Sequence, residues 1–279
     1  MQSRKTQLEW RRIKRTMCRW PLWLLMCFLG LLYVVPLVWM GAVSLKPKDQ
    51  AAAPGVALLP EFDVGTAGNA RPGSLADSAY WRGLAAQASR NYADVWNSPV
   101  ADFPIYTRNS TLIALLGVIG MVLSSTVVAY GFSRLRWRGR DAVFVLVLAT
   151  LMIPQAVLVA PQYILFKKLG LIGTFAPLWL PAWFGGAFGI FLLRQFFMGI
   201  PRELDEAARI DGCSHWGVFW RIILPLSKPA IIVVALFYFV GSWNDFLGPL
   251  VFLNHQSQYT LQLGLQMFQS QHGGCDIGI

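Results

Sequence analysis

The sequence predicts an all-α integral membrane protein with five transmembrane helices. Of its 279 residues, 55% are hydrophobic and 14% are charged, whereas soluble domains carry about 25% charged residues. Several apolar runs reach the length of about 20 residues that a helix needs to cross a bilayer. Basic residues gather between these runs, which is typical of the loops of membrane proteins. The predicted spans are residues 20–45, 109–133, 142–166, 169–193 and 230–253.

The distribution of basic residues predicts the orientation of these spans. Residues 1–19 contain seven Lys and Arg and are expected to stay in the cytoplasm. The run 20–45 carries no charge and exceeds the roughly 7–15 apolar residues of a signal peptide, so we expect a retained helix. The inner segments then carry 16 Lys and Arg and the outer segments 8. This bias predicts a multi-pass protein of the cell membrane with a cytoplasmic N-terminus.

Two polar segments lie outside the predicted spans. Residues 46–107 form the expected extracytoplasmic loop, with one amphipathic helix over 77–96. A lid, a docking ledge and a passive surface insertion all fit this loop. Residues 254–279 form a polar tail without an apolar run of spanning length. With five spans, this tail is expected on the outer side.

Prolines and one acidic residue mark candidate positions for a solute pathway. Pro154 and Pro161 interrupt the third run, and a proline kink in a membrane is tolerated beside neighbouring helices or a water-lined cavity. This helix therefore either lines a pathway or carries a packed kink. Asp245 follows Trp243 and Asn244 in the fifth run, and an ionisable residue within a span indicates a functional site by default. A pathway or gating role and a solvated interfacial position are both open for Asp245.

The segment 199–229, between the fourth and fifth runs, is predicted to form a helix–turn–helix elbow on the cytoplasmic surface. Pro201 suits the first turn of a helix, and the acidic residues after it lie where the helix dipole favours carboxylates. Gly212 permits a tight backbone turn. A second helix is expected over 214–223, and Leu224-Pro225 is expected to end it, because proline disfavours helix at the residue before it.

The elbow carries a motif that resembles a known family. E-A-A-x-x-D-G begins at Glu206, and Leu224-Pro225 follows twelve positions after its glycine; this pattern resembles the EAA loop of ABC importer permeases. Further matching segments are N-Y-A-D-V-W from Asn91, R-N-S-T-L from Arg108, F-x-x-L-G-L from Phe166 and W-N-D-F from Trp243. Together they resemble the carbohydrate-uptake branch, in particular the smaller permease of maltose-type heterodimers, over residues 92–265. That family normally has six spans, so we expect either truncation before a sixth helix or a five-span variant.

The resemblance implies a permease subunit that forms half of the pathway of an ATP-driven importer for a sugar or sugar-like solute. It implies a second permease subunit, an ATP-binding subunit dimer and an extracytoplasmic solute-binding protein as partners, with membrane lipid around the spans. ATP and Mg would bind to the partner ATPase, and no cofactor is expected on this chain. ATP hydrolysis would therefore lie on a partner, and this chain would not be an enzyme.

In this family the elbow docks into a cleft of the ATPase. The residues that the motif places in this coupling loop are Glu206, Ala207, Ala208, Asp211, Gly212, Leu224 and Pro225. Glu206 is expected to make a polar contact, and the two alanines are expected to allow close approach, since larger side chains would overfill a docking cleft. The rival interpretation is an amphipathic helix that lies on lipid. The acidic first arm disfavours it, because membrane-binding faces favour Lys and Arg.

Other function classes are disfavoured by what the sequence contains. It has no G-x-x-x-x-G-K-[ST] motif for ATP phosphates, and its four cysteines and three histidines show no metal-ligand spacing. No catalytic constellation is expected. The basic residues alternate with apolar runs, which disfavours a nucleic-acid-binding protein. An ATP-independent secondary transporter or channel is the alternative function, and it predicts charged relays and inverted repeats within the spans.

Overall fold

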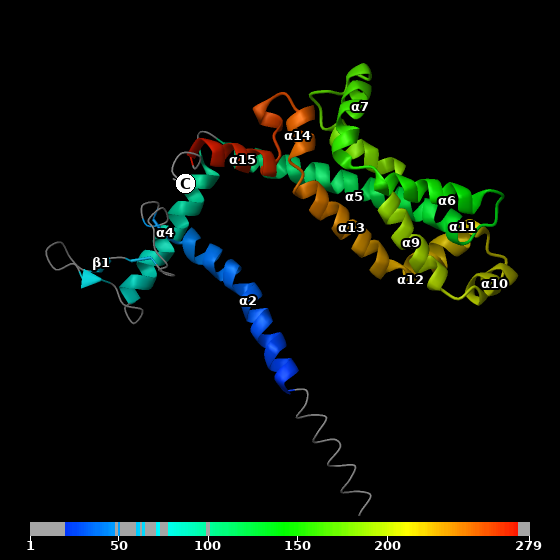
Figure 1. Ribbon diagram of the computed structural model, residues 1–279, viewed down its shortest axis with the longest axis horizontal. Coiled ribbons are helices and arrows are strands. Elements are labelled where there is room, and N and C mark those ends of the chain that lie inside the picture. Colours follow the sequence, from blue (N-terminus) through cyan, green and yellow to red (C-terminus); the bar gives the residue numbers. More distant parts are fainter. Residues whose placement is uncertain are drawn as a thin grey trace, which may run out of the picture. The chain divides into compact units, whose positions relative to one another are not determined.

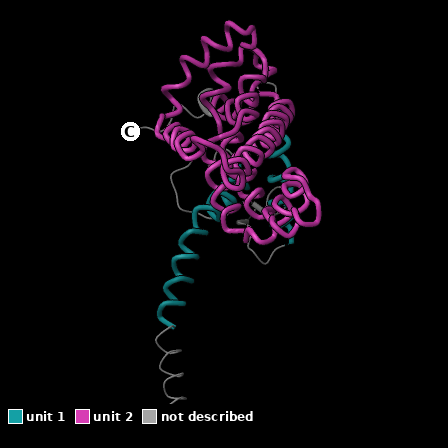
Figure 2. The backbone as a smooth tube through the Cα atoms, turned by 90° about the vertical axis from the view of Figure 1, so that its right-hand side faces the viewer, with its two compact units in different colours: residues 1–97 teal, residues 98–279 magenta. Residues whose placement is uncertain are grey.

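The computed structural model describes residues 20–47, 50, 60–61, 63–64, 71–72, 78–98 and 101–272. The chain divides into two compact units, residues 1–97 and 98–279 (Figure 2). The predicted basic N-terminus, residues 1–19, lies outside the described residues, as do residues 273–279 at the other end. Each unit is described by itself.

The first unit contains a long apolar helix and an amphipathic one. Helix α2, Trp20–Ser44, occupies the first predicted span, and α4, Ser78–Trp96, lies where the sequence predicts an amphipathic helix. The Asn91 side-chain amide on α4 donates to the backbone carbonyls of Ser44 and Lys46, at 2.9 Å each. These bonds attach α4 to the end of α2. A short antiparallel pair, β1 (Asp63–Val64) and β2 (Arg71–Pro72), completes the described part of this unit.

The second unit is built around α5, Phe103–Ser133, which packs against α9 and α13 (Figure 1). The helix begins six residues before the predicted span at 109, because the Asp102 side chain accepts from the amide of Ile105 and caps its start. Gly117 and Gly120 let neighbours approach closely. A β-carbon at either position would collide with the ring of Tyr238 or Trp183, respectively.

The third apolar run is broken rather than kinked. It forms α6 (Arg140–Ala149), a 3₁₀ turn η1 (Thr150–Met152) and α7 (Gln155–Lys168), with 100° between its two halves. Ile153 is extended, with φ −83° and ψ 117°, because the proline that follows it disfavours the helical conformation. The expectation of one kinked helix over 142–166 is therefore wrong at Pro154, whereas Pro161 lies inside α7.

The fourth run is shifted relative to the prediction. A turn with positive φ at Gly170 and Gly173 replaces the expected start at 169. The span then comprises α8 (Ala176–Trp179), η2 (Leu180–Phe184) and α9 (Ala187–Gly199). Glycine tolerates a positive φ, which a right-handed helix does not contain. Gly170 and Gly173 therefore form a turn, and the fourth span begins after it.

The fifth run also divides, and the tail is structured. Helix α13 (Lys228–Trp243) ends before Asp245, and α14 (Leu247–Phe252) follows. The polar tail contains η4 (Gln256–Gln258) and α15 (Leu261–His272). Its backbone bonds to α5, since Asn109 donates to the carbonyls of Ser257 and Tyr259 at 3.0 and 3.1 Å. The tail is thus packed against the start of α5.

Among the described residues, three helices are long and apolar enough to cross a membrane, and up to five if each bent pair counts as one span. The described chain is therefore a helical, multi-pass membrane protein. Broken helices in membranes are tolerated where protein or a water-filled cavity satisfies the freed backbone groups. Each bent pair therefore indicates a place where a cavity is to be looked for.

Candidate functional site

The elbow between α9 and α13 consists of two short helical arms. The first arm is α10, Glu203–Ile210. The second is α11 (His215–Val218), continued by a π-helical turn η3 (Phe219–Ile223) and α12 (Leu224–Leu226). Gly212 joins the arms with φ +85°, a conformation that strains any other residue. The Ser214 hydroxyl accepts from the amide of Gly217 at 3.2 Å and caps the second arm.

The second arm does not end at Leu224-Pro225, contrary to the sequence prediction. The amide of Leu224 donates to the carbonyl of Phe219, five residues back, which widens the helix into a π turn. Pro225 then lies in the first turn of α12, where its missing N–H leaves no unpaired donor. The arm continues to Leu226, and the chain bends by 75° into α13.

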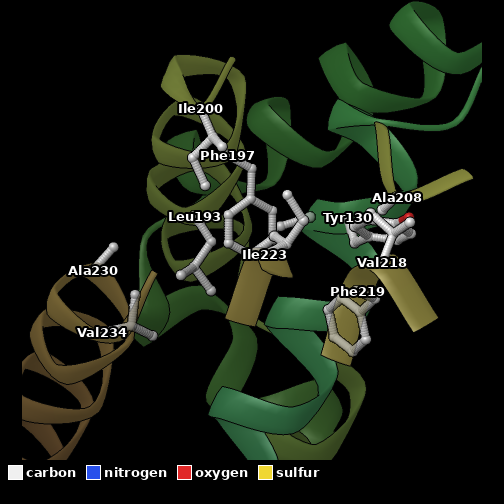
Figure 3. Close-up of a cluster of buried hydrophobic side chains, with 11 residues drawn as sticks. Tyr130, Leu193, Phe197, Ile200, Ala208, Val218, Phe219, Ile223, Ala230 and Val234 are labelled. Carbon is white, nitrogen blue, oxygen red and sulfur yellow. The ribbon is translucent and has the colours of Figure 1, made fainter. Parts of the chain in front are cut away.

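One face of the elbow is buried against the spans (Figure 3). Val218, Phe219 and Ile223 of the second arm are almost fully buried. The residues that form this cluster are Ala129, Tyr130, Leu193, Phe197, Ile200, Ala208, Val218, Phe219, Ile223, Ala230 and Val234. They come from α5, α9, the elbow and α13, so the second arm is an integral part of the bundle.

Ala208 lies in this cluster, which corrects its expected role. It is the buried residue of α10, so its small side chain permits packing within this chain. Ala207 is exposed beside it. Ala208 is therefore not exposed to a partner as expected, and the role expected for Ala207 stays a prediction.

Arg134, directly after α5, connects three elements through its guanidinium. Nη1 lies 3.2 Å from the Asp205 carboxylate on α10. Nη2 donates to the carbonyls of Phe197 and Ile200 at the end of α9, at 2.6 and 2.8 Å. Within the same region, the Tyr130 hydroxyl donates to the carbonyl of His215 at 2.9 Å. We call the three contacts of Arg134, with Asp205, Phe197 and Ile200, the arginine clamp.

The arginine clamp is largely buried, with 4% of the Arg134 side chain and 16% of the Asp205 side chain exposed. Burial raises the pKa of the Asp205 carboxyl above its ordinary value, and the positive charge of Arg134 opposes that rise. Burial likewise lowers the pKa of Arg134, with Asp205 opposing. Arg134 Nε and Asp205 Oδ1 are buried and have no hydrogen-bond partner among the described residues. The ion pair is therefore a single contact in this structure.

The other face of the elbow is exposed. Glu206, Ala207, Asp211 and Gly212 all lie on it, and Ile210 is 87% exposed. Asp205 and Glu206 also border a hollow of ≈ 630 Å³ beside the clamp. The basic side chains at this hollow are Arg134, Arg136, Arg202, Arg209 and His215. The exposed face of the elbow thus carries acidic and small residues and one large apolar side chain, and it borders a hollow rich in arginine.

A second candidate region is a cavity of ≈ 560 Å³ among the spans. Asp245 lines it, and its carboxylate accepts from the amide of Gly248 at 3.1 Å, which caps α14. Trp243 and Asn244 are not among its lining residues: the Trp243 ring stacks on Phe239, and the Asn244 amide donates to the carbonyl of Val240. Pro154 is not among them either, although it breaks the helix beside the cavity.

Sequence reasoning missed four polar residues that line this cavity: Gln155, Gln162, Tyr238 and Ser242. The two glutamines are seven residues apart, which places them on one face of α7. That spacing within an apolar run was the available signal. In the described part of the chain, no group of three or more His, Cys, Asp or Glu could hold a metal ion.

Broken spans beside a polar-lined cavity are a feature shared with membrane transporters. Residues 118–273 match the family described as "Binding-protein-dependent transport system inner membrane component". The match covers more than half of the chain, and the chain belongs to this family.

Known relatives agree with this assignment. The chain is 39% identical to the arabinooligosaccharides transport system permease protein AraQ of Halalkalibacterium halodurans, over 59% of each chain. It is 37% identical to the trehalose/maltose transport system permease protein MalG of Thermococcus litoralis, over 66% of each. These two alignments thus span less than two thirds of the relatives. The AraQ of Bacillus subtilis is 30% identical over 91% of this chain and 82% of that protein.

The fold also resembles a solved structure. The match is a chain in the crystal structure of a bacterial ABC transporter involved in the import of the acidic polysaccharide alginate. The TM-score is 0.69 with 21% identity, over 91% of this chain and 80% of that chain. At this identity the likeness supports the fold.

Proposed function

We propose that this chain is a permease subunit of an ATP-driven ABC importer for a sugar or sugar-like solute. The family assignment and the relatives named for arabinooligosaccharide and trehalose/maltose transport support this proposal. They favour it over an ATP-independent secondary transporter or channel. In this function the chain forms half of the pathway, and a second permease subunit forms the other half.

The observation that carries the proposal is an exposed docking face on a firmly attached elbow. Val218, Phe219 and Ile223 fix the second arm in the bundle core. The first arm presents Glu206, Ala207 and Ile210 outward. A surface that transmits force must be exposed to its partner and fixed to the body that moves, and the elbow meets both conditions. We assign this face to an ATP-binding subunit, which would hold ATP and Mg.

The proposed orientation places the elbow and the N-terminus in the cytoplasm. The loop that contains Arg134, Arg136, Arg138 and Arg140 lies next to the elbow and supplies the basic residues typical of the inner side. The ATPase would reach the elbow there. A solute-binding protein would deliver solute at the opposite side, and lipid would cover exposed apolar helices such as α2.

The cavity that Asp245 lines is the proposed contribution of this chain to the pathway. Its polar side chains offer hydrogen bonds, and Phe237 offers an aromatic surface. Both features suit a sugar, because its hydroxyl groups lie along the edges of the ring and its apolar C–H groups form the ring faces. Lysine and arginine are absent from the described residues that line the cavity.

Co-purification tests the docking face. The tagged chain is expressed with the transport genes adjacent to its own, extracted in mild detergent, and the bound proteins are identified. Ile210→Glu places a charge on the exposed face without removing internal packing, because Ile210 is 87% exposed. We expect the parent chain to retain an ATPase and Ile210→Glu to lose it.

Ile210→Leu is the matched control, since it keeps an apolar side chain of similar volume at the same exposed position. It should retain the ATPase as the parent does. Retention of equal amounts by Ile210→Glu and Ile210→Leu would place docking elsewhere. Absence of an ATPase from the parent preparation would contradict the proposed function itself.

A further inference from the structure

We propose that Arg134 is the positioning residue that transmits displacement of the docking arm α10 to the spanning helices α5 and α9. This inference rests on the proposed function, because it assumes that a partner moves the elbow. The arginine clamp joins three elements that are distant in the sequence: Arg134 follows α5, Asp205 lies on α10, and the two carbonyls end α9.

Helix α10 has little packing of its own. Ala208 is its buried residue, and a single alanine buries little apolar surface. The second arm, in contrast, contributes Val218, Phe219 and Ile223 to the core. Besides this alanine contact, the ion pair of Asp205 with Arg134 joins α10 to the end of a span, and it is the polar side-chain contact described between them. The arm that carries the exposed face is therefore positioned chiefly by the clamp.

Arg134 also contacts the end of α9, through Nη2 of its guanidinium. The carbonyls near a helix C-terminus lack intrahelical partners. At the end of α9, Arg134 Nη2 donates to the carbonyls of Phe197 and Ile200 at 2.6 and 2.8 Å, and the Phe197 carbonyl also accepts from the amide of Ile200. The backbone amide of Arg134 also donates to the carbonyl of Tyr130, which continues the hydrogen bonding of α5. A shift of Asp205 is therefore felt at the ends of both spanning helices.

Helix α5 and the segment just before α9 both contribute to the wall of the cavity. Met121 on α5 lines the cavity, and Gly185, just before α9, lines it as well. Helices are stiff along their length, so a displacement at their ends near Arg134 reaches these positions. The clamp thus lies between the docking arm and two segments of the cavity wall.

Arginine suits this position better than lysine. Its planar guanidinium presents five donors in a fixed arrangement, whereas the lysine ammonium is a point charge on a flexible stem. The guanidinium reaches its three acceptors from two separate nitrogens, Nη1 and Nη2, whereas an ammonium carries its three donors on one nitrogen. Arg134 Nε and Asp205 Oδ1 are also unused among the described residues, which leaves room for a second, bidentate arrangement of the pair.

The test compares what the docking arm and the cavity each sense. The complete complex that co-purifies with this chain is trapped with Mg-ATP and orthovanadate, and amide hydrogen exchange is measured before and after trapping. Two segments are compared: α10, and residues 237–248, which include the cavity-lining Tyr238 and Asp245. The variants are Arg134→Lys and Asp205→Asn, and the control is Arg138→Lys, at an exposed arginine of the same loop that does not line the hollow beside the clamp.

In the parent and in Arg138→Lys, we expect trapping to change exchange in both segments. In Arg134→Lys and Asp205→Asn, trapping should still change hydrogen exchange in α10. The change in the exchange of residues 237–248 should be smaller than in the parent by about fivefold or more, since fivefold is the lower limit of common coupling between two sites. A merely structural role would alter both segments together. Equal responses of 237–248 in Arg134→Lys and in the parent would overturn the inference.

Two further outcomes separate this inference from the proposed function. If Arg134→Lys does not assemble, Asp205→Asn decides on the same measurement, because it keeps the shape of the side chain and leaves the carbonyl contacts of Arg134 in place. If the parent chain binds no ATPase, the proposed function fails first. If the ATPase binds and the clamp variants behave as the parent does, the function stands and the role of Arg134 does not.

Discussion

Phe219 provides the strongest test of how the elbow is attached to the bundle. Its ring is 1% exposed and lies 5.0 Å from the ring of Tyr130, centroid to centroid. Truncation of a buried phenylalanine to alanine costs about 3–5 kcal/mol, because apolar contacts are lost and a cavity forms. Each 1.4 kcal/mol is a factor of ten, so Phe219→Ala should raise the opening equilibrium of the second arm roughly 100-fold to 4,000-fold.

Trp220 is the matched control, since it is the next residue on the same arm and is 59% exposed. Its ring contacts Phe219 at 5.5 Å between centroids, and such a pair contributes about 0.5–1.5 kcal/mol. Trp220→Ala should therefore change the opening equilibrium about tenfold or less. Hydrogen exchange of residues 215–226 in detergent measures both variants. Comparable losses of protection would refute the reasoning that burial against α5 attaches the elbow.

Three further perturbations follow from the packing and the charges. Gly120→Val should lower the melting temperature in detergent, at a cost of about 1–3 kcal/mol, because its β-carbon would collide with Trp183. Gly131→Ala is the control: its β-carbon meets open space, so the substitution should be neutral or stabilising by up to about 1 kcal/mol. Asp245→Ala should remove the cap of α14 and increase hydrogen exchange there, at a cost of about 0.5–2 kcal/mol. The pKa of Asp205 is raised in the folded state, so the protonated side chain stabilises the fold when the pH is below the ordinary pKa of 3.8. This contribution to the free energy of unfolding is lost as the pH rises through the raised pKa. Asp205→Asn should therefore flatten the decline of melting temperature above pH 3.8, and an unchanged decline would contradict this assignment.

The apolar runs could be predicted from the sequence because their composition is a property of each segment alone. The breaks within them could not. At Ile153, the restriction that Pro154 imposes was visible in the sequence, but a kink and a break of 100° share the same composition. The packing of neighbouring helices decides between them. The positive-φ turn at Gly170 similarly displaced the start of the fourth span.

The elbow shows the same division between local and tertiary information. Its two arms and the Gly212 turn followed from local residue preferences. The inward position of Ala208 could have been found from spacing, because Asp205 and Ala208 lie three residues apart and share one face of α10. The contact of Asp205 with Arg134 joins residues 71 positions apart. No local pattern in a single sequence identifies such a pair.

The loop after α5 shows how one cluster of charges serves two physical purposes. Read from the sequence, its four arginines were equivalent contributions to membrane orientation. In the structure they differ: Arg134 is buried with 4% of its side chain exposed, Arg136 and Arg138 are exposed, and Arg140 pairs with Asp141 at 3.0 Å. Orientation depends on the number of positive charges near the end of a span, to which each arginine contributes alike. The clamp depends on donor geometry, which is particular to Arg134. Exchange of Arg134 for lysine keeps the first property and changes the second, so this substitution separates the two roles.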